Sequence, residues 1–139
     1  MNQGYEFFDH TADVGVRLRG GTLQALFSHA MAALTQLIAE NSSLESSEER
    51  VVELKASDAS TLLLSWLQEL LFWFSTDRFL PASCSFDTLT PTGLRAHVRG
   101  ERFDPARHVF GTEVKGITRH ALDVQQTPEG WEGTVIFDV

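Results

Sequence analysis

Residues 14–38 read VGVRLRGGTLQALFSHAMAALTQLI, and this stretch decides how the chain folds. Residues 14–19 alternate apolar with polar or small side chains, which is the period-two pattern of a half-buried strand. Gly20 and Gly21 then indicate a turn, and Thr22 is suited to cap a helix. From Leu23 onward, apolar residues recur at the spacing of one face of a four-turn helix. The stretch therefore predicts a strand, a tight turn and an amphipathic helix in succession.

The rest of the chain adds one more helix and several strands. Ser57 can cap the second helix, predicted over residues 57–76, which is so apolar that it must be central or contact a partner. Strands are predicted near residues 52–56, 84–88, 94–99, 112–125 and 131–139, with a loop over residues 100–111. Because no repeat or linker divides the chain, we predict one α+β domain over residues 1–139. It should be a two-layer fold, with a mostly antiparallel sheet packed against two main helices.

The composition is that of an acidic globular protein. The chain has 139 residues and a formal net charge of −8, with 42% hydrophobic residues. Cys84 is the only cysteine, which excludes an intramolecular disulfide and a multi-thiolate metal site. The first residues lack a secretory signal, and the most apolar window, residues 62–74, is too short and too polar to span a membrane. We therefore expect a cytoplasmic protein that does not bind membranes.

Charge is unevenly distributed along the chain. Residues 95–120 carry six basic and three acidic side chains, whereas the remainder sums to −11. A polyanion would be repelled by most of such a protein, so stable direct nucleic-acid binding is not expected unless the basic segment forms one patch. A basic protein, or a metal-rich site on such a protein, is a better electrostatic match for this acidic chain than a nucleic acid is. The alternation over residues 94–99 predicts a hairpin strand with one basic face.

Two acidic positions are candidates for a metal site. Asp9 and Asp13 flank His10 just before the first predicted strand, and Asp138 lies beside Val139 at the end of the last one. Carboxylates suit hard divalent cations. The alternative is that Asp9 or Asp13 caps a turn, that His10 packs against the sheet and that Asp138 is a frayed end. The residues alone leave both interpretations open.

Other polar residues give no catalytic signature. Glu113 and Lys115, at i and i+2, would lie on one side of a strand, where a local ion pair is the simpler interpretation. Ser28 and His29 are adjacent on a helix and cannot face each other as a nucleophile and its base. The sequence also lacks a nucleophile elbow, a P-loop and a zinc-ligand spacing.

Four motifs resemble the archease family and occur in the family's order over nearly the whole chain. They are HTADVG at residues 10–15, WLQELLF at 66–72, GTEVK at 111–115 and VIFDV at 135–139. Arg119 departs from the family, which often has an aromatic residue there.

The resemblance implies a non-catalytic accessory protein of the GTP-dependent RNA-splicing ligase of the RtcB type. Such a protein promotes guanylylation of the ligase's active-site histidine, and so multiple turnovers in tRNA splicing or RNA repair. By motif match, a divalent ion (calcium, magnesium or manganese) would be bound by Asp13, Asp138 and an oxygen of Val139. His10, Glu113 and Lys115 lie in matching motifs and are expected as neighbours of that site.

Two other functions compete with this one. A chaperone-like binding module could dock the apolar helix 57–76 onto RNA-modifying enzymes such as a tRNA methyltransferase, with Trp73 in the contact. A metal-dependent hydrolase could use His10, Asp13 and Asp138. The oligomeric state is left open by the sequence.

Overall fold

The computed structural model describes residues 4–10 and 13–139. Within them lie seven strands and two helices, in an order that alternates strand-rich segments with single helices. The elements are β1 (Tyr5–His10), β2 (Asp13–Gly20), α1 (Leu23–Ile38), β3 (Glu48–Lys55), α2 (Ala59–Asp77), β4 (Phe79–Thr90), β5 (Gly93–Arg102), β6 (Gly116–Thr127) and β7 (Gly130–Asp138). The predicted α+β class with antiparallel strands and two main helices is confirmed.

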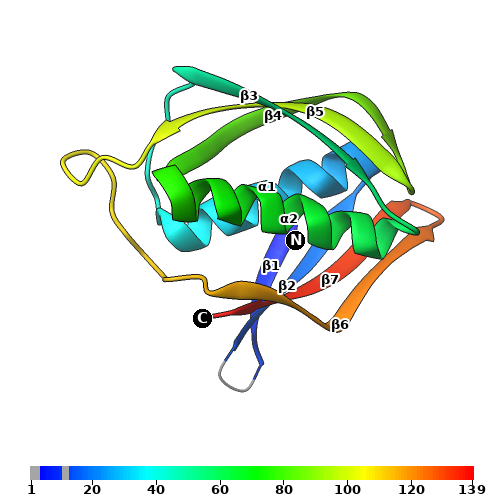
Figure 1. Cartoon of the computed structure of the whole chain (residues 1–139). Helices are drawn as coiled ribbons and strands as arrows, with labels where there is room; N and C mark the ends of the chain where they lie inside the picture. The colour runs from blue at the N-terminus through cyan, green and yellow to red at the C-terminus, as the bar shows by residue number, and fades with distance from the viewer. Residues whose placement is uncertain (1–3, 11–12) are drawn as a thin grey trace.

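The described strands form two sheets, one on each side of the helix pair (Figure 1). Sheet A has the order β1-β2-β7-β6, and sheet B has the order β3-β5-β4; every pairing in both is antiparallel. Each helix contacts strands of both sheets, so the helices fill the space between them. Sequence patterns predicted six of the seven described strands. They suggested one sheet and not two, because an alternating pattern identifies the buried face of a strand but not the strand that pairs with it.

The turn from β2 into α1 forms for the predicted reasons. The Oγ1 of Thr22 accepts a hydrogen bond from the Ala25 N–H at 3.1 Å, which caps the helix. Gly20 must lack a side chain, because a Cβ there would lie 2.6 Å from the backbone nitrogen of Leu26. The turn therefore brings α1 directly back over sheet A.

Helix α2 is the central element of the molecule. Trp66 is fully buried, and its indole Nε1–H donates to the carbonyl of Phe27 on α1 at 3.0 Å. Trp73 is also buried, so of the large apolar residues of α2 only Phe72, at 58% exposed, reaches solvent to a large extent. The apolar character of this helix thus reflects burial between two sheets, and Trp73 is not available for docking.

Three local predictions need correction. Strand β1 was not predicted as a strand, because the sequence analysis began at Asp9 and left open whether the segment from Asp9 to Asp13 is extended or forms a turn. The cap of α2 is Asp58, whose carboxylate accepts from the Thr61 N–H at 2.8 Å, and not the neighbouring Ser57. Strand β6 begins at Gly116, so the predicted start at Thr112 was wrong; residues 112–115 instead bond to α1 and β7. No described helix has the length and apolar character needed to cross a membrane.

Candidate functional site

The strand register brings the two candidate acidic positions to the same end of sheet A. Strands β2 and β7 are antiparallel neighbours in which Val14 pairs with Phe137, so Asp13 and Asp138 each lie one residue beyond that pair. The carbonyl of Asp138 also accepts a hydrogen bond from the Lys115 N–H at 2.7 Å. We call Asp13, Asp138 and Val139 the acidic end; Figure 1 places the C-terminus beside the base of the β1–β2 hairpin.

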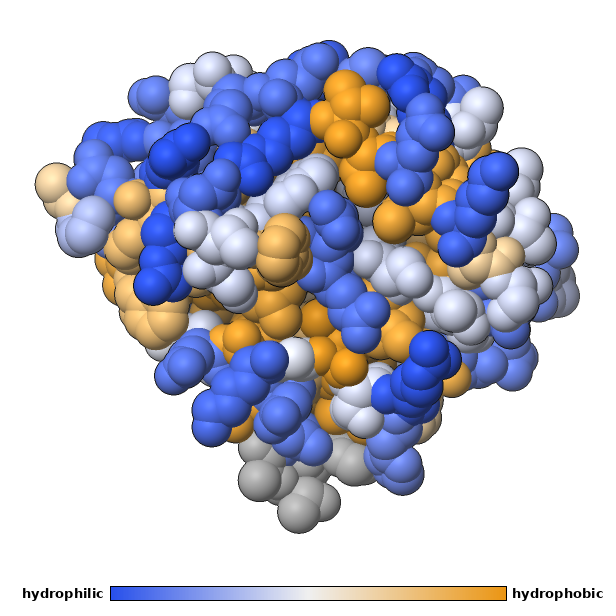
Figure 2. All heavy atoms as spheres, in the orientation of Figure 1, coloured by the Kyte–Doolittle hydropathy of each residue, from blue (hydrophilic) through white to orange (hydrophobic). Residues whose placement is uncertain are grey.

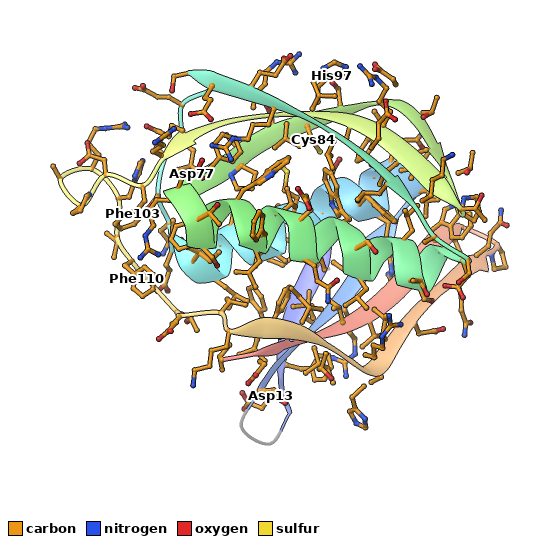
Figure 3. The ribbon with its side chains drawn as sticks, in the orientation of Figure 1. Asp13, Asp77, Cys84, His97, Phe103 and Phe110 are labelled. Carbon is orange, nitrogen blue, oxygen red and sulfur yellow. The ribbon has the colours of Figure 1, made fainter. Side chains whose placement is uncertain are left out.

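The side chains of the acidic end are accessible to a ligand. Asp13 and Val139 are half-buried and Asp138 is exposed, and Figure 3 labels Asp13 at the start of β2. No described residue donates a capping hydrogen bond to Asp9 or Asp13. Thr11, Ala12 and the side chain of His10 lie outside the described residues, although the backbone of His10 pairs with Asp13.

This donor set fits a hard divalent cation. Two carboxylates and a main-chain or terminal oxygen are the ligands that calcium, magnesium and manganese prefer. Over the described residues, no group of three or more His, Cys, Asp or Glu side chains is placed to bind a metal ion. A site at the acidic end would therefore depend on two side chains, with the remaining ligands from the backbone, solvent or a partner.

Glu113 and Lys115 belong to an irregular segment and not to a strand. Both side chains are exposed, and no ion pair joins them or ties either to another described residue. The local ion pair expected from their spacing is thus not found. Lys115 is next to the acidic end through its backbone, whereas Glu113 lines a neighbouring pocket.

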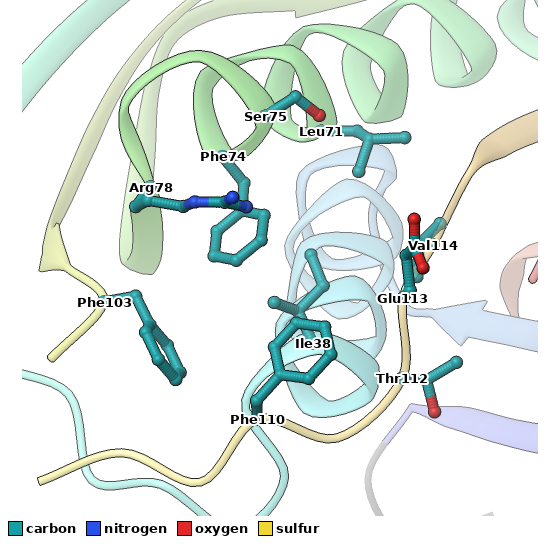
Figure 4. Close-up of a pocket in the computed structure, with 10 residues that line it drawn as sticks. All are labelled: Ile38, Leu71, Phe74, Ser75, Arg78, Phe103, Phe110, Thr112, Glu113 and Val114. Atoms are coloured by element: carbon teal, nitrogen blue, oxygen red, sulfur yellow. The ribbon is translucent and has the colours of Figure 1, made fainter. Parts of the chain in front are cut away.

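That pocket, of about 470 Å³, lies between α2, the end of α1 and residues 103–114 (Figure 4). Its apolar lining consists of Ile38, Leu71, Phe74, Phe103, Phe110 and Val114. The rings of Phe74 and Phe103 are perpendicular at 6.3 Å between centroids, and those of Phe103 and Phe110 are nearly so at 6.1 Å. This pocket was not predicted from the sequence, although two aromatic residues in the loop predicted over residues 100–111, Phe103 and Phe110, could have indicated it.

A buried polar cluster holds the wall of the pocket in place. Glu101 accepts hydrogen bonds from the Glu45 N–H at 2.6 Å, from Arg107 and from His108 Nε2 at 3.2 Å. His108, itself buried, accepts at Nδ1 from the Asp104 N–H at 2.8 Å. Burial alone would raise the pKa of Glu101, but the bonds from Glu45, Arg107 and His108 outweigh it and lower that pKa. These hydrogen bonds hold residues 104–108, which lie between Phe103 and Phe110, in place beside Glu101.

The basic face predicted for residues 94–99 is neutralised by its neighbours on sheet B. Arg95 pairs with Glu53 and Asp87, Arg99 pairs with Glu49 at 2.9 Å, and His97 contacts Asp87 at 2.8 Å and Glu49 at 3.4 Å. Hydrogen bonds to Asp87 and Glu49 raise the pKa of His97. The sequence missed this pairing because β3 and β4 contribute the acids from distant positions.

Potential nucleophiles have other partners. The hydroxyl of Ser28 lies 3.4 Å from the sulfur of Cys84, and His29 Nδ1 donates to the carbonyl of Arg19 at 2.6 Å. Burial raises the pKa of the Cys84 thiol. Ser28 and His29 therefore do not form a nucleophile and base pair, as predicted.

These features define a class: a small α+β protein whose two antiparallel sheets enclose two helices, with an acidic strand end beside an apolar pocket. The model of the Archease protein family (MTH1598/TM1083) matches residues 5–139. Proteins named archease from Methanosarcina barkeri and Pyrococcus furiosus are 30% and 32% identical to the chain. Each match covers 97% of this chain, and 95% and 98% of those proteins respectively. The chain belongs to the archease family.

Solved structures agree with this assignment. The solution structure of protein 1598 from Methanobacterium thermoautotrophicum is 32% identical, with a TM-score of 0.82 and 99% of both chains covered. A crystal structure from Thermotoga maritima, described as an archease and possible chaperone, is 17% identical with a TM-score of 0.67. That match covers 95% of this chain and 94% of the other, and at this identity it supports the fold alone.

Proposed function

We propose that this protein activates a GTP-dependent RNA-splicing ligase of the RtcB type. It would promote guanylylation of the ligase's active-site histidine, and so multiple turnovers, without itself joining RNA. One observation carries the proposal: the β2–β7 register brings Asp13 and Asp138 together at one end of sheet A. Membership of the archease family supports it, because the resemblance of the four motifs implies this role.

The acidic end would act by contact with the ligase active site. A site that binds GTP and RNA ends must be electropositive, so it attracts a protein of net charge −8. The range of this attraction is the screening length, which shortens as the ionic strength rises. Asp13, Asp138 and an oxygen of Val139 would bind one calcium, magnesium or manganese ion. Such an ion supplies charge neutralisation for phosphate oxygens and a template that orients them. Lys115 and Glu113 would flank the contact, and His10 would be a neighbour through its backbone, which pairs with Asp13.

A protein partner in the cytoplasm suits the surface better than RNA does. The arginines of sheet B that could have formed a basic patch are paired with acidic residues of the same sheet. Paired surface charges present little net positive potential to a polyanion. We therefore propose that RNA is contacted by the ligase and that this protein forms no stable complex with nucleic acid alone.

The test is the amount of covalent GMP on the cognate ligase during repeated turnovers with GTP and a divalent ion. Asp13→Asn and Asp138→Asn should each reduce the stimulation at least about tenfold, because each removes one of the two carboxylates. Asp123→Asn, an equal change of charge at an exposed site on β6, should leave it unchanged. Full stimulation by both acidic-end variants would refute the proposed mechanism.

A second candidate function is a chaperone-like module for RNA-modifying enzymes such as a tRNA methyltransferase. The observation in its favour is exposed apolar surface: Phe72, Val109 and Phe110 are 58%, 63% and 49% exposed. Such a role predicts that Phe72→Ala weakens suppression of client aggregation while Asp13→Asn does not. Light scattering of a heated client protein with each variant distinguishes the two functions.

A further inference from the structure

The one cationic side chain that lines the pocket beside the acidic end has no carboxylate partner among the described residues. Arg78 lies at the rim, where its guanidinium is 5.2 Å from the centroid of the Phe74 ring, and no carboxylate within residues 4–10 or 13–139 pairs with it. Six of the other eight arginines form ion pairs with described residues, namely Arg19, Arg50, Arg95, Arg99, Arg102 and Arg107, whereas Arg17 and Arg119 do not. Figure 4 shows Arg78 and Glu113 on opposite sides of the pocket, with the Phe74 ring beside Arg78.

Arg78 also occupies an unfavourable backbone conformation. It follows α2 with φ of +63°, in the left-handed region, where its N–H donates to the carbonyl of Phe74 at 2.9 Å. Glycine or asparagine is the usual residue at this position of a helix end, because a Cβ is strained there. An arginine in such a conformation is a reason to look for a role of its side chain.

The pocket is formed before any partner arrives. The N–H groups of Gly111 and Thr112 donate to the carbonyls of Ile38 and Leu37 at 2.8 and 2.7 Å, which fixes the loop to the end of α1. The carbonyl of Arg78 accepts from the Phe103 N–H at 2.8 Å, which fixes the other wall to α2. A volume of about 470 Å³ is within the range, about 300–1,000 Å³, of sites that enclose a ligand group.

Residues 113–115 connect the pocket to the acidic end. Glu113 lines the pocket, and two residues later the Lys115 N–H binds the carbonyl of Asp138. Figure 2 shows apolar surface at the left edge of the molecule, where Figure 3 labels Phe103 and Phe110. A partner seated on the acidic end would therefore meet the pocket within the same contact.

We propose that this pocket is the anchor site for a segment of the ligase that carries an aromatic side chain next to a carboxylate. The aromatic ring would extend the perpendicular contacts of Phe74, Phe103 and Phe110. The carboxylate would pair with Arg78, for which the described part of the chain supplies no acid. This inference rests on the proposed function, since it names the surface of this protein that binds the same ligase.

The experiment is calorimetric titration of the ligase with two pocket variants and two matched controls, together with the guanylylation assay. Arg78→Gly removes the cation and relieves the backbone, and Ser75→Phe fills the pocket from an exposed helix position. Each should raise the Kd at least about tenfold, as expected for an interface anchor. Lys55→Gln and Gln68→Phe, at exposed positions outside the pocket, should change it less than about twofold.

The outcomes separate the two proposals. If the wild-type protein binds and stimulates the ligase but both pocket variants bind equally well, the anchor site is refuted and the proposed function stands. If the wild-type protein neither binds nor stimulates the ligase, both are refuted. A photo-reactive benzoylphenylalanine in place of Phe110, an exposed aromatic residue that already lines the pocket, should cross-link to a ligase peptide with an aromatic residue beside Asp or Glu. A cross-link to a second copy of this chain, or to a peptide without those residues, would overturn the assignment.

Discussion

His97 lies on the outer face of sheet B between Asp87 and Glu49, which also pair with Arg95 and Arg99. Because two carboxylates accept from its ring, its pKa in the folded protein is above the ordinary 6.5. The contribution of His97 to stability is therefore complete below pH 6.5 and is lost as pH rises through the folded value. An NMR titration of the ring protons should give a midpoint above 6.5 that falls in Asp87→Asn. A midpoint at or below 6.5 would contradict this assignment.

Glu101 is the buried acid whose loss should matter most to stability. Glu101→Gln removes the charge that Arg107 and His108 face, so we expect it to lower the free energy of unfolding by about 3 kcal/mol. The lowered pKa of Glu101 means that this stability is present above pH 4.5 and is lost as pH falls through the folded value. Urea unfolding at pH 7 and at pH 3 measures both effects.

A matched control for Glu101 is available on sheet A. Glu132→Gln breaks an exposed pair with Arg19 at 3.6 Å, which should cost less than about 1 kcal/mol at either pH. An equal cost for the two variants at pH 7 would show that the Glu101 cluster does not hold the loop.

At the scale of elements, α2 should respond very differently to changes on its two sides. Trp66→Ala removes a fully buried ring and leaves the Phe27 carbonyl without its donor, so about 4 kcal/mol of stability should be lost. Phe72→Ala, on the exposed side of the same helix, should cost less than about 1 kcal/mol. Thermal or urea unfolding of both variants measures the difference, and similar costs would show that α2 is not the core of the fold.

Elements were predictable where one local pattern determines them. Thr22 and the apolar spacing after Leu23 predicted α1 correctly, because capping and amphipathic periodicity are local properties. The segment from Thr112 to Lys115 was mistaken for strand, since its alternating pattern does not reveal that its backbone bonds to α1 and to Asp138. Whether an alternating segment becomes a strand depends on which distant segment it hydrogen-bonds to, and a single sequence does not show that pairing.

At the scale of the whole molecule, charge arithmetic along the chain was a poor guide to the surface. Residues 95–120 carry a net charge of +3, yet Arg95 and Arg99 face acids that β3 and β4 supply. The pocket was hidden for a similar reason, because Arg78, Phe103 and Glu113 come together only when α2, β5 and the following loop are folded. Asp13 and Asp138 were selected from motifs near the two ends of the chain, and the register then placed both at one end of adjacent strands.

A manganese titration followed by backbone amide NMR tests directly whether Asp13 and Asp138 form one cation site. Paramagnetic broadening should affect Val14, Lys115 and Asp138 first, because their amides adjoin the acidic end. Asp138→Asn should abolish that selectivity. Broadening that begins elsewhere, for example at Glu45, Glu48 or Glu49, or that is unchanged in Asp138→Asn, would show that Asp13 and Asp138 do not bind one cation together.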